Sequence, residues 1–202
     1  MAGMQDKPAV FTIGHSNHPL ARFIDLLRGT GGTGVTAVAD VRSIPYSRRW
    51  PQFGRPALER SLGEAGIAYV FLGAELGGKR DDPALLRDGR VDYDRVAATE
   101  SFRTGLDRVE EGARRHRVAL MCAEREPLDC HRFLLVARRL RERAVPIEHI
   151  LADGTIEKHD ATERRLLAAV GLNDLFSSGV PPRDAVARAY ALRSAKRLAG
   201  RR

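Results

Sequence analysis

The strongest constraint on the fold is an alternation of short apolar runs with helical patterns along the chain. The runs AVFTIG, VTAVADV, IAYVFL, VALMC and PIEHIL are rich in β-branched residues, as buried strands are. Between them, apolar residues recur at helical spacing, as Phe23, Leu26 and Leu27 do after Pro19. Strands that alternate with helices form a parallel sheet covered on both faces. The sequence therefore predicts a three-layer α/β fold, with a mostly parallel sheet flanked by helices and a short edge hairpin in ADGTIEKH.

The remaining helices are expected over residues 56–65, about 102–115, about 130–143 and 160–170, with a polar loop before the second of them. Beyond Gly171 the pattern changes, and from Ala185 the chain is an alanine- and arginine-rich helix former with few large apolar residues. We therefore expect an α/β body over residues 1–171 and a basic helical C-terminal extension over residues 172–202. Such an extension docks on the body, docks on a partner or stays frayed.

Length and charge limit the classes of function. A chain of 202 residues holds one domain with a substantial core, and its net charge of +8 suits an anionic small molecule or a nucleic acid as partner. Arginine greatly outnumbers lysine, as in proteins of GC-rich genomes, so charge alone carries little weight. No apolar run approaches the roughly 20 residues that span a bilayer, and the start MAGMQDKPAV does not resemble a signal peptide. We expect a cytoplasmic protein with no membrane partner and with reduced cysteines.

Reactive residue types follow several of the predicted strands. In open α/β sheets, ligands bind beyond the carboxyl ends of the strands. His15 and Ser16 follow the first strand, Asp40 and Arg42 end the second, and Glu124 follows the fourth. We therefore expect these side chains to share one pocket at the sheet edge. Simpler interpretations also stand: Arg42 forms an ion pair with Asp40 or Glu124, and Ser16 caps the first helix.

The stretch CAEREPLDCHR, from Cys122 to Arg132, holds both cysteines of the protein. Asp129 is placed to cap the following helix, so that Cys130, His131 and Arg132 occupy its first turn, where backbone N–H groups and the helix dipole favour an anion. Arg132 should point toward the site and, with Arg42 and His15, bind a phosphate or carboxylate.

The residue types of this stretch suggest several chemistries. A cysteine phosphatase is excluded because neither cysteine has an arginine six residues later, and a dithiol redox pair normally shows a C-x-x-C spacing, which is absent. Structural zinc usually needs two close-spaced ligand pairs, but a metal held by Cys122, Cys130, His131 and Glu124 stays open. Neighbouring residues on one helical turn point about 100° apart, which makes joint ligation by Cys130 and His131 awkward. Cys130 could also act as a nucleophile with a lowered pKa.

The loop SIPYSRRWPQFGRP, residues 43–56, interleaves aromatic and basic side chains, among them Tyr46, Arg48 and Trp50. Aromatic rings and guanidinium planes stack on nucleobases. The alternative is a proline-stiffened flap whose aromatic rings pack on the domain.

Four blocks in this order, TIGHSN, DVRSIPYSRRWPQF, GIAYVFLGAELGG and ALMCAEREPLDCHR, resemble the signature blocks of the bacterial and archaeal family called domain of unknown function 488. The resemblance covers about residues 10–154. It implies a compact α/β domain and supplies no reaction.

The sequence thus favours an enzyme that acts on a phosphate-bearing substrate, a nucleotide or a nucleic acid, at the carboxyl edge of the sheet. We expect the ligand contacts from Ser16, Arg42, Tyr46, Arg48 and Arg132, and the catalytic groups from His15, Asp40, Glu124 and Cys130. The alternatives are a non-catalytic nucleic-acid-binding module and a metal or thiol-redox site of Cys122, Cys130 and His131. The sequence names no substrate, no cofactor and no oligomeric state.

Overall fold

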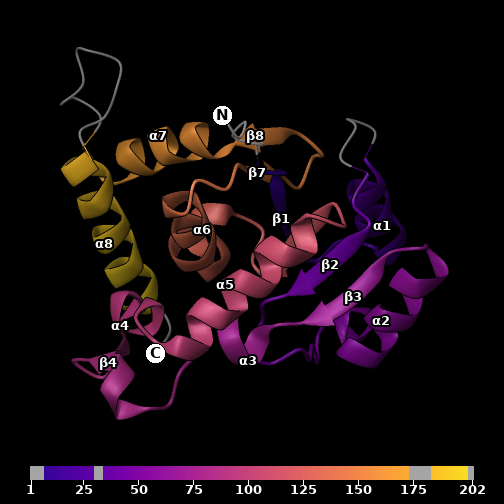
Figure 1. Ribbon diagram of the computed structural model, residues 1–202, viewed down its shortest axis with the longest axis horizontal. Helices are drawn as coiled ribbons and strands as arrows, with labels where there is room; N and C mark the ends of the chain where they lie inside the picture. Colours follow the sequence, from indigo (N-terminus) through magenta and orange to yellow (C-terminus); the bar gives the residue numbers. More distant parts are fainter. Residues whose placement is uncertain (1–6, 30–33, 173–182, 200–202) are drawn as a thin grey trace, which may run out of the picture.

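The computed structural model describes residues 7–29, 34–172 and 183–199, and these form a sheet with helices on both faces (Figure 1). The six strands lie in the order β3-β2-β6-β1-β7-β8. Their bounds are β1 Val10–Gly14, β2 Ala37–Asp40, β3 Ala68–Phe71, β6 Val118–Cys122, β7 Ile147–Ile150 and β8 Ile156–Lys158. All neighbours pair in parallel except β7 and β8, which pair antiparallel. The predicted three-layer fold and the edge hairpin are confirmed.

Two separate core clusters identify the layers. Helices α1 (Leu20–Arg28) and α2 (Arg55–Glu64) pack on one face with Phe23, Leu58 and the inward side chains Ala119 and Met121 of β6. On the other face lie α3 (Gly73–Leu76), α4 (Tyr93–Ala97), α5 (Glu100–Ala113), a π-helical turn (Arg132–Ala137) that leads into α6 (Arg138–Glu142), and α7 (His159–Ala169). Because side chains alternate along a strand, Cys122 at the end of β6 belongs to this second face.

The segment expected to be a polar loop between β3 and α5 differs from the prediction. It contains α3, α4 and a two-stranded ladder of β4 (Leu86–Arg87) and β5 (Arg90–Val91). Helices of four or five residues are too short to show a helical period in the sequence, so the pattern did not reveal them. Helix α5 itself begins where Thr99 accepts a hydrogen bond from the backbone N–H of Phe102, 3.2 Å away.

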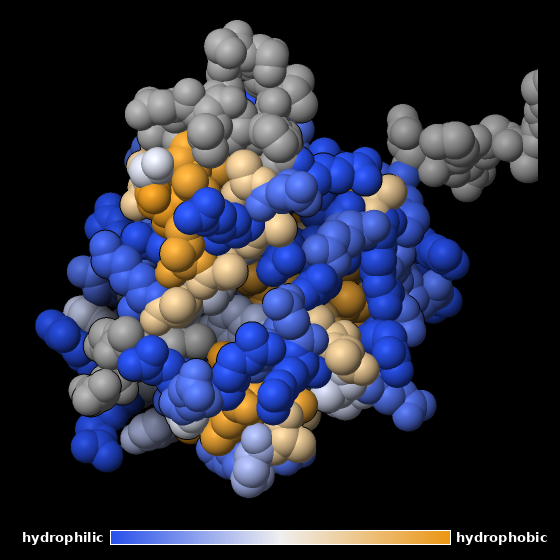
Figure 2. Space-filling view, turned by 90° about the vertical axis from the view of Figure 1, so that its left-hand side faces the viewer, coloured by the Kyte–Doolittle hydropathy of each residue, from blue (hydrophilic) through white to orange (hydrophobic). Residues whose placement is uncertain are grey.

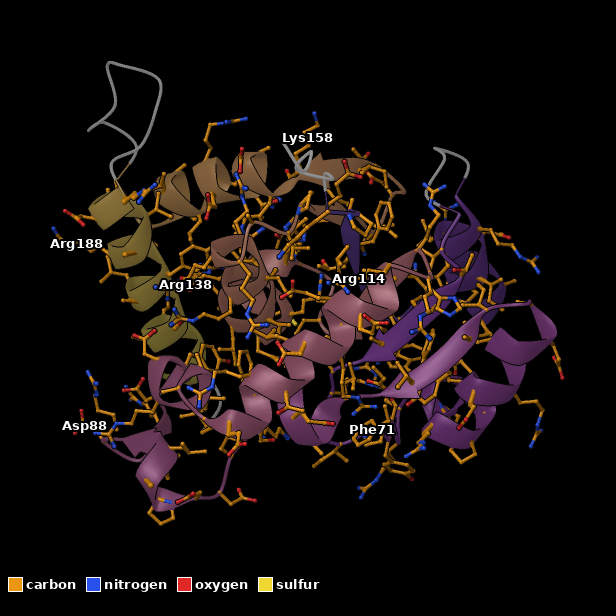
Figure 3. The ribbon with its side chains drawn as sticks, viewed as in Figure 1. Phe71, Asp88, Arg114, Arg138, Lys158 and Arg188 are labelled. Carbon is orange, nitrogen blue, oxygen red and sulfur yellow. The ribbon has the colours of Figure 1, made fainter. Side chains whose placement is uncertain are left out.

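The C-terminal extension packs on the body as helix α8 (Arg183–Ala199). Tyr190 is buried in the same core cluster as the sheet, and the guanidinium of Arg138 lies 5.0 Å from the centre of its ring. Figure 3 shows Arg138 reaching from α6 toward α8. The sequence allowed this segment to dock on the body, to dock on a partner or to stay frayed, and its described part docks on the body. The segment 173–182 before it lies outside the described residues.

The outer surface of this side is mainly hydrophilic. Figure 2 views the molecule from the side on which α8 lies in Figure 1, and hydrophilic residues cover most of it, with smaller hydrophobic areas between them. Among the described residues, no helix combines the length and the apolar character needed to cross a membrane.

Candidate functional site

A cleft opens at the carboxyl end of β6. The connections after β1 and β2, the two neighbours of β6, run through α1 and α2 on one face, whereas the connection after β6 runs through the π turn and α6 on the other. Connections that part in this way leave a crevice beyond the strand ends, which is the usual ligand position in such sheets. A cavity of about 1040 Å³ lies there, and its lining comes from the ends of β1, β2 and β6 and from the loops beside them.

The cavity lining carries an excess of positive charge. Its basic side chains are Arg42, Arg49, Lys79 and Arg125, and Glu124 is the one carboxylate among the described lining residues. Of the residues singled out in the sequence, His15, Ser16, Arg42, Tyr46, Cys122, Glu124 and His131 line this cavity. Asp40, Cys130 and Arg132 are fully buried behind the lining, and Arg48 is exposed outside it.

Arg42 is held by a network that reaches the floor of the cleft. Its Nε and Nη2 donate to the two carboxylate oxygens of Asp40, at 2.9 and 2.6 Å, and Nη1 donates to the carbonyl of Phe53 at 2.8 Å. Burial alone lowers the pKa of Arg42, but the hydrogen bonds and charge of Asp40 outweigh it and raise that pKa above its ordinary value. Tyr69, whose hydroxyl donates to Asp40 at 2.8 Å, completes the pairing of this buried carboxylate. The Asp40–Arg42 ion pair that the sequence allowed is therefore present, and Arg42 still faces the cavity.

His15 is a neutral side chain that helps to fix Arg42. Its Nδ1 lies 2.9 Å from the carbonyl of Ser16, to which it donates, and its Nε2 accepts from Arg42 Nη1 at 3.3 Å. The ring stacks on Phe53, with centroids 4.3 Å apart. Burial, followed by the positive charge of Arg42, lowers the pKa of His15 to about 4. With both ring nitrogens engaged, His15 is placed to orient its neighbours.

Ser16 does not cap helix α1. Its φ of 48° lies in the left-handed region, which is uncommon outside glycine and concentrates at functional sites. Its backbone N–H continues the ladder with β6 by donating to the carbonyl of Ala123 at 3.0 Å, and its hydroxyl donates to Asn17 at 3.2 Å. The helix begins after Pro19 without a side-chain cap.

Arg132 has a different position from the expected one. Its two terminal nitrogens donate to the carbonyls of Glu124 and Arg125, at 2.5 and 3.1 Å. The side chain thereby fixes the loop after β6 from behind. Gly14 allows this arrangement, because a Cβ there would lie 1.9 Å from the carbonyl oxygen of Glu124. Arg132 supports the cavity wall and does not line the cavity.

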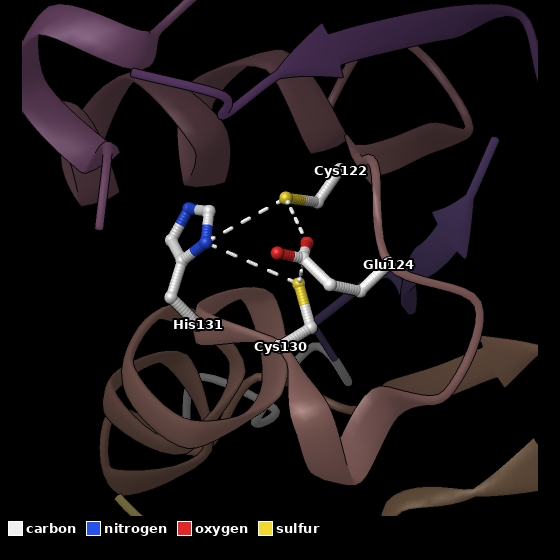
Figure 4. Close-up of side chains that lie close together, drawn as sticks. All are labelled: Cys122, Glu124, Cys130 and His131. Atoms are coloured by element: carbon white, nitrogen blue, oxygen red, sulfur yellow. Dashed lines mark hydrogen bonds between the residues drawn. The ribbon is translucent and has the colours of Figure 1, made fainter. Parts of the chain in front are cut away.

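Cys122, Glu124, Cys130 and His131 form a compact cluster at one side of the cleft (Figure 4). The carboxylate oxygen Oε2 of Glu124 accepts from both thiols, at 3.0 Å from Cys122 and 3.1 Å from Cys130. Nδ1 of His131 lies 3.6 Å from the sulfur of Cys122 and 3.9 Å from that of Cys130. Both cysteines are buried and unbridged. Four reactive side chains from a strand end, a loop and a helix start thus face a common point.

The helix start differs from the prediction that Asp129 caps it. Asp129 ends a 3₁₀ turn and binds Arg193 of α8. Cys130 instead takes the capping place: its backbone is extended, with φ −127° and ψ 140°, and its carbonyl accepts from Phe133 and Leu134. Its sulfur accepts from the backbone N–H of Arg132 at 3.4 Å. The π turn that follows is a feature common at functional sites.

The two thiols have opposite acidities. Burial raises the pKa of Cys122 well above its usual value, and the neighbouring Cys130 adds to this effect. Burial also acts to raise the pKa of Cys130, but the hydrogen bond from Cys122 and the charge of Arg132 reverse it and bring that pKa well below its usual value. Cys130 is therefore the more acidic thiol of the pair.

The aromatic loop 43–56 packs one of its aromatic side chains in the core and places two others at the cavity. Phe53 is buried in the core against His15, whereas Tyr46, with 68% of its surface exposed, and Trp50 line the cavity. Arg49, next to the expected Arg48, faces the cavity and places its guanidinium 5.5 Å from the Trp50 ring. Alternation along an irregular loop has no fixed period, so the sequence could not choose between Arg48 and Arg49.

Three groups at the site escaped the sequence analysis. Lys79 and Arg125 line the cavity, and Gly78 packs so closely on His131 that a Cβ would lie 2.5 Å from its ring. Arg125 lies within the CAEREPLDCHR stretch and could have been found there, since it directly follows Glu124. Lys79 and Gly78 follow the buried α3, whose helical period was too short to detect.

Comparison with known proteins gives one family. No curated protein and no solved structure matches the chain. The sequence profile of a domain of unknown function, DUF488, matches residues 19–139, more than half of the chain, and spans the Asp40–Arg42 pair, the aromatic loop and the cysteine cluster. The chain therefore belongs to the DUF488 family.

Proposed function

We propose that this protein is an enzyme that acts on a phosphate-bearing substrate, a nucleotide or a nucleic acid, in the cleft at the carboxyl edge of the sheet. The observation that carries the proposal is the charge of the cavity lining, where Arg42, Arg49, Lys79 and Arg125 face a single carboxylate among the described lining residues. Such a surface attracts anions and raises their local concentration.

The basic side chains of the cavity would contribute to anion binding in different ways. Arg42 is already held rigid by Asp40 and Phe53, so little side-chain entropy is lost when a ligand contacts it. Its charge is balanced by Asp40, however, and the net attraction comes from Arg49, Lys79 and Arg125. Guanidinium groups suit phosphate because their planar N–H groups match two phosphate oxygens at once.

The aromatic side chains favour a nucleotide over inorganic phosphate. Tyr46 and Trp50 line the same cavity as the basic groups. A base that stacks on an aromatic ring gains about 1–3 kcal/mol, with little dependence on its identity. A cavity of about 1040 Å³ has room for a nucleotide.

Glu124 is the candidate acid–base group. It reaches the cavity, whereas Asp40 is enclosed by Arg42 and Tyr69, and both ring nitrogens of His15 are engaged. A carboxylate beside two thiols and an imidazole can exchange protons with them and with a substrate. Cys130 lies behind the lining, so any part it takes in proton transfer would pass through Glu124, which accepts its hydrogen bond.

Calorimetric titration tests the binding step. We expect nucleoside monophosphates to bind the unaltered chain at least tenfold more tightly than the matching nucleosides, and the difference to shrink as salt rises. The double variant Arg49→Ala/Lys79→Ala should lose this difference, while Arg60→Ala, which changes an exposed arginine on α2, should keep it. Equal affinity for nucleoside and nucleotide would overturn the proposal.

Turnover separates an enzyme from a non-catalytic nucleic-acid-binding module. A panel of nucleotides and short single-stranded oligonucleotides is incubated with the protein and analysed for products. An enzyme should lose product formation in Glu124→Gln while ligand affinity stays within a few-fold. Binding with no product from any member of the panel would favour the binding module.

A further inference from the structure

We propose that Cys122, Cys130 and His131 hold a divalent transition-metal ion of the zinc type in the wall of the cleft, with the Glu124 carboxylate as the fourth, exchangeable ligand. The inference goes beyond the proposed function and does not depend on it, because it rests on the cluster alone. It is carried by four ligand atoms that lie within 4.8 Å of one another.

The distances fit a tetrahedral ion. Zinc lies about 2.3 Å from sulfur and about 2.0–2.2 Å from nitrogen or oxygen, so its ligand atoms are separated by roughly 3.3–3.8 Å. Here the sulfurs lie 3.0 and 3.1 Å from the Glu124 oxygen and 3.6 and 3.9 Å from His131 Nδ1. These four distances need changes of only a few tenths of an ångström to match an ion, and all four donor atoms lie within 4.8 Å of one another.

His131 is already in the tautomer that binds a metal. Its Nε2 lies 2.8 Å from the carbonyl of Val41 and donates to it, so the lone pair is on Nδ1, which faces both sulfurs (Figure 4). Histidine ligands usually donate their second N–H to a carbonyl or carboxylate in this way, which fixes the ring. Gly78 packs closely against the imidazole ring and limits its movement, since only a residue without Cβ fits there.

Cys130 and His131 both reach the cluster although they are neighbours in the sequence. The 100° separation expected within a helical turn does not apply, because Cys130 has an extended backbone and only His131 belongs to the helix. The backbone N–H of Arg132 donates to the Cys130 sulfur, as amides do to metal-bound thiolates. The backbone between strand β6 and the π turn therefore lets Cys130 and His131 point to the same place, which two neighbours on one helical turn would not do.

The donor set selects the kind of ion and the kind of site. Two sulfurs and an imidazole favour zinc and similar ions over magnesium or calcium, which prefer oxygen ligands. Cys122, Glu124 and His131 line the cavity, and Cys130 lies behind them. A closed structural site has four ligands of its own, whereas three firm ligands and a carboxylate that can move aside resemble a catalytic site that opens to substrate.

Cobalt titration tests the site. The full chain is purified without chelator for metal analysis, then stripped with chelator under reducing conditions and titrated with Co²⁺. We expect one Co²⁺ per chain, an intense thiolate-to-cobalt charge-transfer absorption, and displacement of cobalt by Zn²⁺. Absence of that absorption at stoichiometric Co²⁺ would overturn the proposal. So would an affinity of the reduced chain for Co²⁺ that is no higher than the affinity of an exposed histidine.

Variants locate the ion. Cys130→Ser and His131→Gln should each weaken Co²⁺ binding at least tenfold, and Glu124→Gln should weaken it less and shift the absorption. His116→Gln, which changes an exposed histidine, is the control and should bind normally. Because serine at the buried Cys130 could also affect folding, thermal unfolding is measured with and without Zn²⁺: the ion should raise the midpoint in the unaltered chain and in His116→Gln but not in His131→Gln. An equal rise in the unaltered chain and in both histidine variants would place the ion elsewhere and contradict the assignment.

Discussion

Two clusters of polar side chains, each of which contains histidine, lie within the described part of the structure, and they are built differently. The cleft cluster, Cys122, Glu124, Cys130 and His131, directs its donor atoms to one point and borders the cavity. The second, which we call the histidine chain, is formed by Thr12, His149, His159, Tyr190 and Glu163.

The histidine chain is a linear series of hydrogen bonds that runs from Thr12 to Glu163. Thr12 Oγ1 lies 2.7 Å from His149 Nδ1, His149 Nε2 lies 3.1 Å from His159 Nδ1, and His159 Nε2 lies 3.1 Å from the Tyr190 hydroxyl. The line ends where that hydroxyl donates to Glu163 at 3.0 Å. Each group in this series forms a hydrogen bond with the next one. Their lone pairs are used along the series and do not converge on a shared point.

The two clusters differ in arrangement and not in residue type: one directs its donor atoms to a single point beside the cavity, and the other passes hydrogen bonds along a series. Imidazoles occur in both clusters, yet the histidine chain lies outside the described cavity lining and joins β1, β7, α7 and α8. Its role is to fasten the C-terminal helix to the sheet. The two clusters should therefore respond independently to mutation.

The largest expected effect on stability comes from Gly14, which lies against the loop that carries Glu124 of the cleft cluster. In Gly14→Ala the new Cβ would lie 1.9 Å from a backbone oxygen that cannot rotate away, so we expect a loss of stability of about 3 kcal/mol. Urea unfolding measures it. Gly63→Ala in α2 has nothing within 4 Å of the new Cβ and should be neutral or stabilising by up to about 1 kcal/mol. Equal stability of the two variants would show that the Gly14 contact relaxes freely.

Tyr190→Phe tests the independence of the two clusters. Removal of the hydroxyl takes one hydrogen-bond partner from the buried His159 and one from the partly buried Glu163, which should cost about 1–3 kcal/mol. Nucleotide and cobalt binding, measured on the folded variant, should stay unchanged. A loss of either binding in folded Tyr190→Phe would contradict the separation of the clusters.

Acid should destabilise the histidine chain. Burial, and then the charges of His159, Arg132 and Arg165, lower the pKa of His149 well below 6.5. Protons therefore bind the unfolded chain more readily, so the stability that His149 contributes is full above pH 6.5 and falls as the pH drops below it, by at most about 1.4 kcal/mol per unit. Urea unfolding at several pH values should give a shallower decline for His149→Gln than for the exposed-residue control His116→Gln. Parallel declines in the two variants would assign the acid sensitivity to other groups.

The smallest expected effect comes from a variant that disturbs the cleft cluster while leaving all four of its side chains in place. A Cβ in Gly78→Ala would lie 2.5 Å from the His131 ring and should turn it away from the sulfurs. We expect cobalt affinity to fall about tenfold, which corresponds to about 1.4 kcal/mol, with little change in stability. Gly63→Ala again serves as the control. Unchanged affinity in Gly78→Ala would mean that the ring position does not matter for binding.

The sequence by itself determined the succession of the six sheet strands and of the longer helices along the chain, and the edge at which reactive residues gather. His15, Arg42 and Glu124 each follow a strand, and parallel strands bring their carboxyl ends to one edge whatever their separation in the chain. Buried runs and helical periods depend on neighbours in the sequence, so the pattern alone revealed them.

Only the tertiary structure decided which of these side chains face the cleft and which support it. Arg132 turns to backbone carbonyls, Arg49 and not Arg48 reaches the cavity, and the extended backbone at Cys130 lets two adjacent residues meet at one point. The histidine chain likewise joins His149 to Tyr190 across distant segments. Side-chain direction at loops and helix starts depends on backbone angles and long-range contacts, and neither follows a period that a sequence can display.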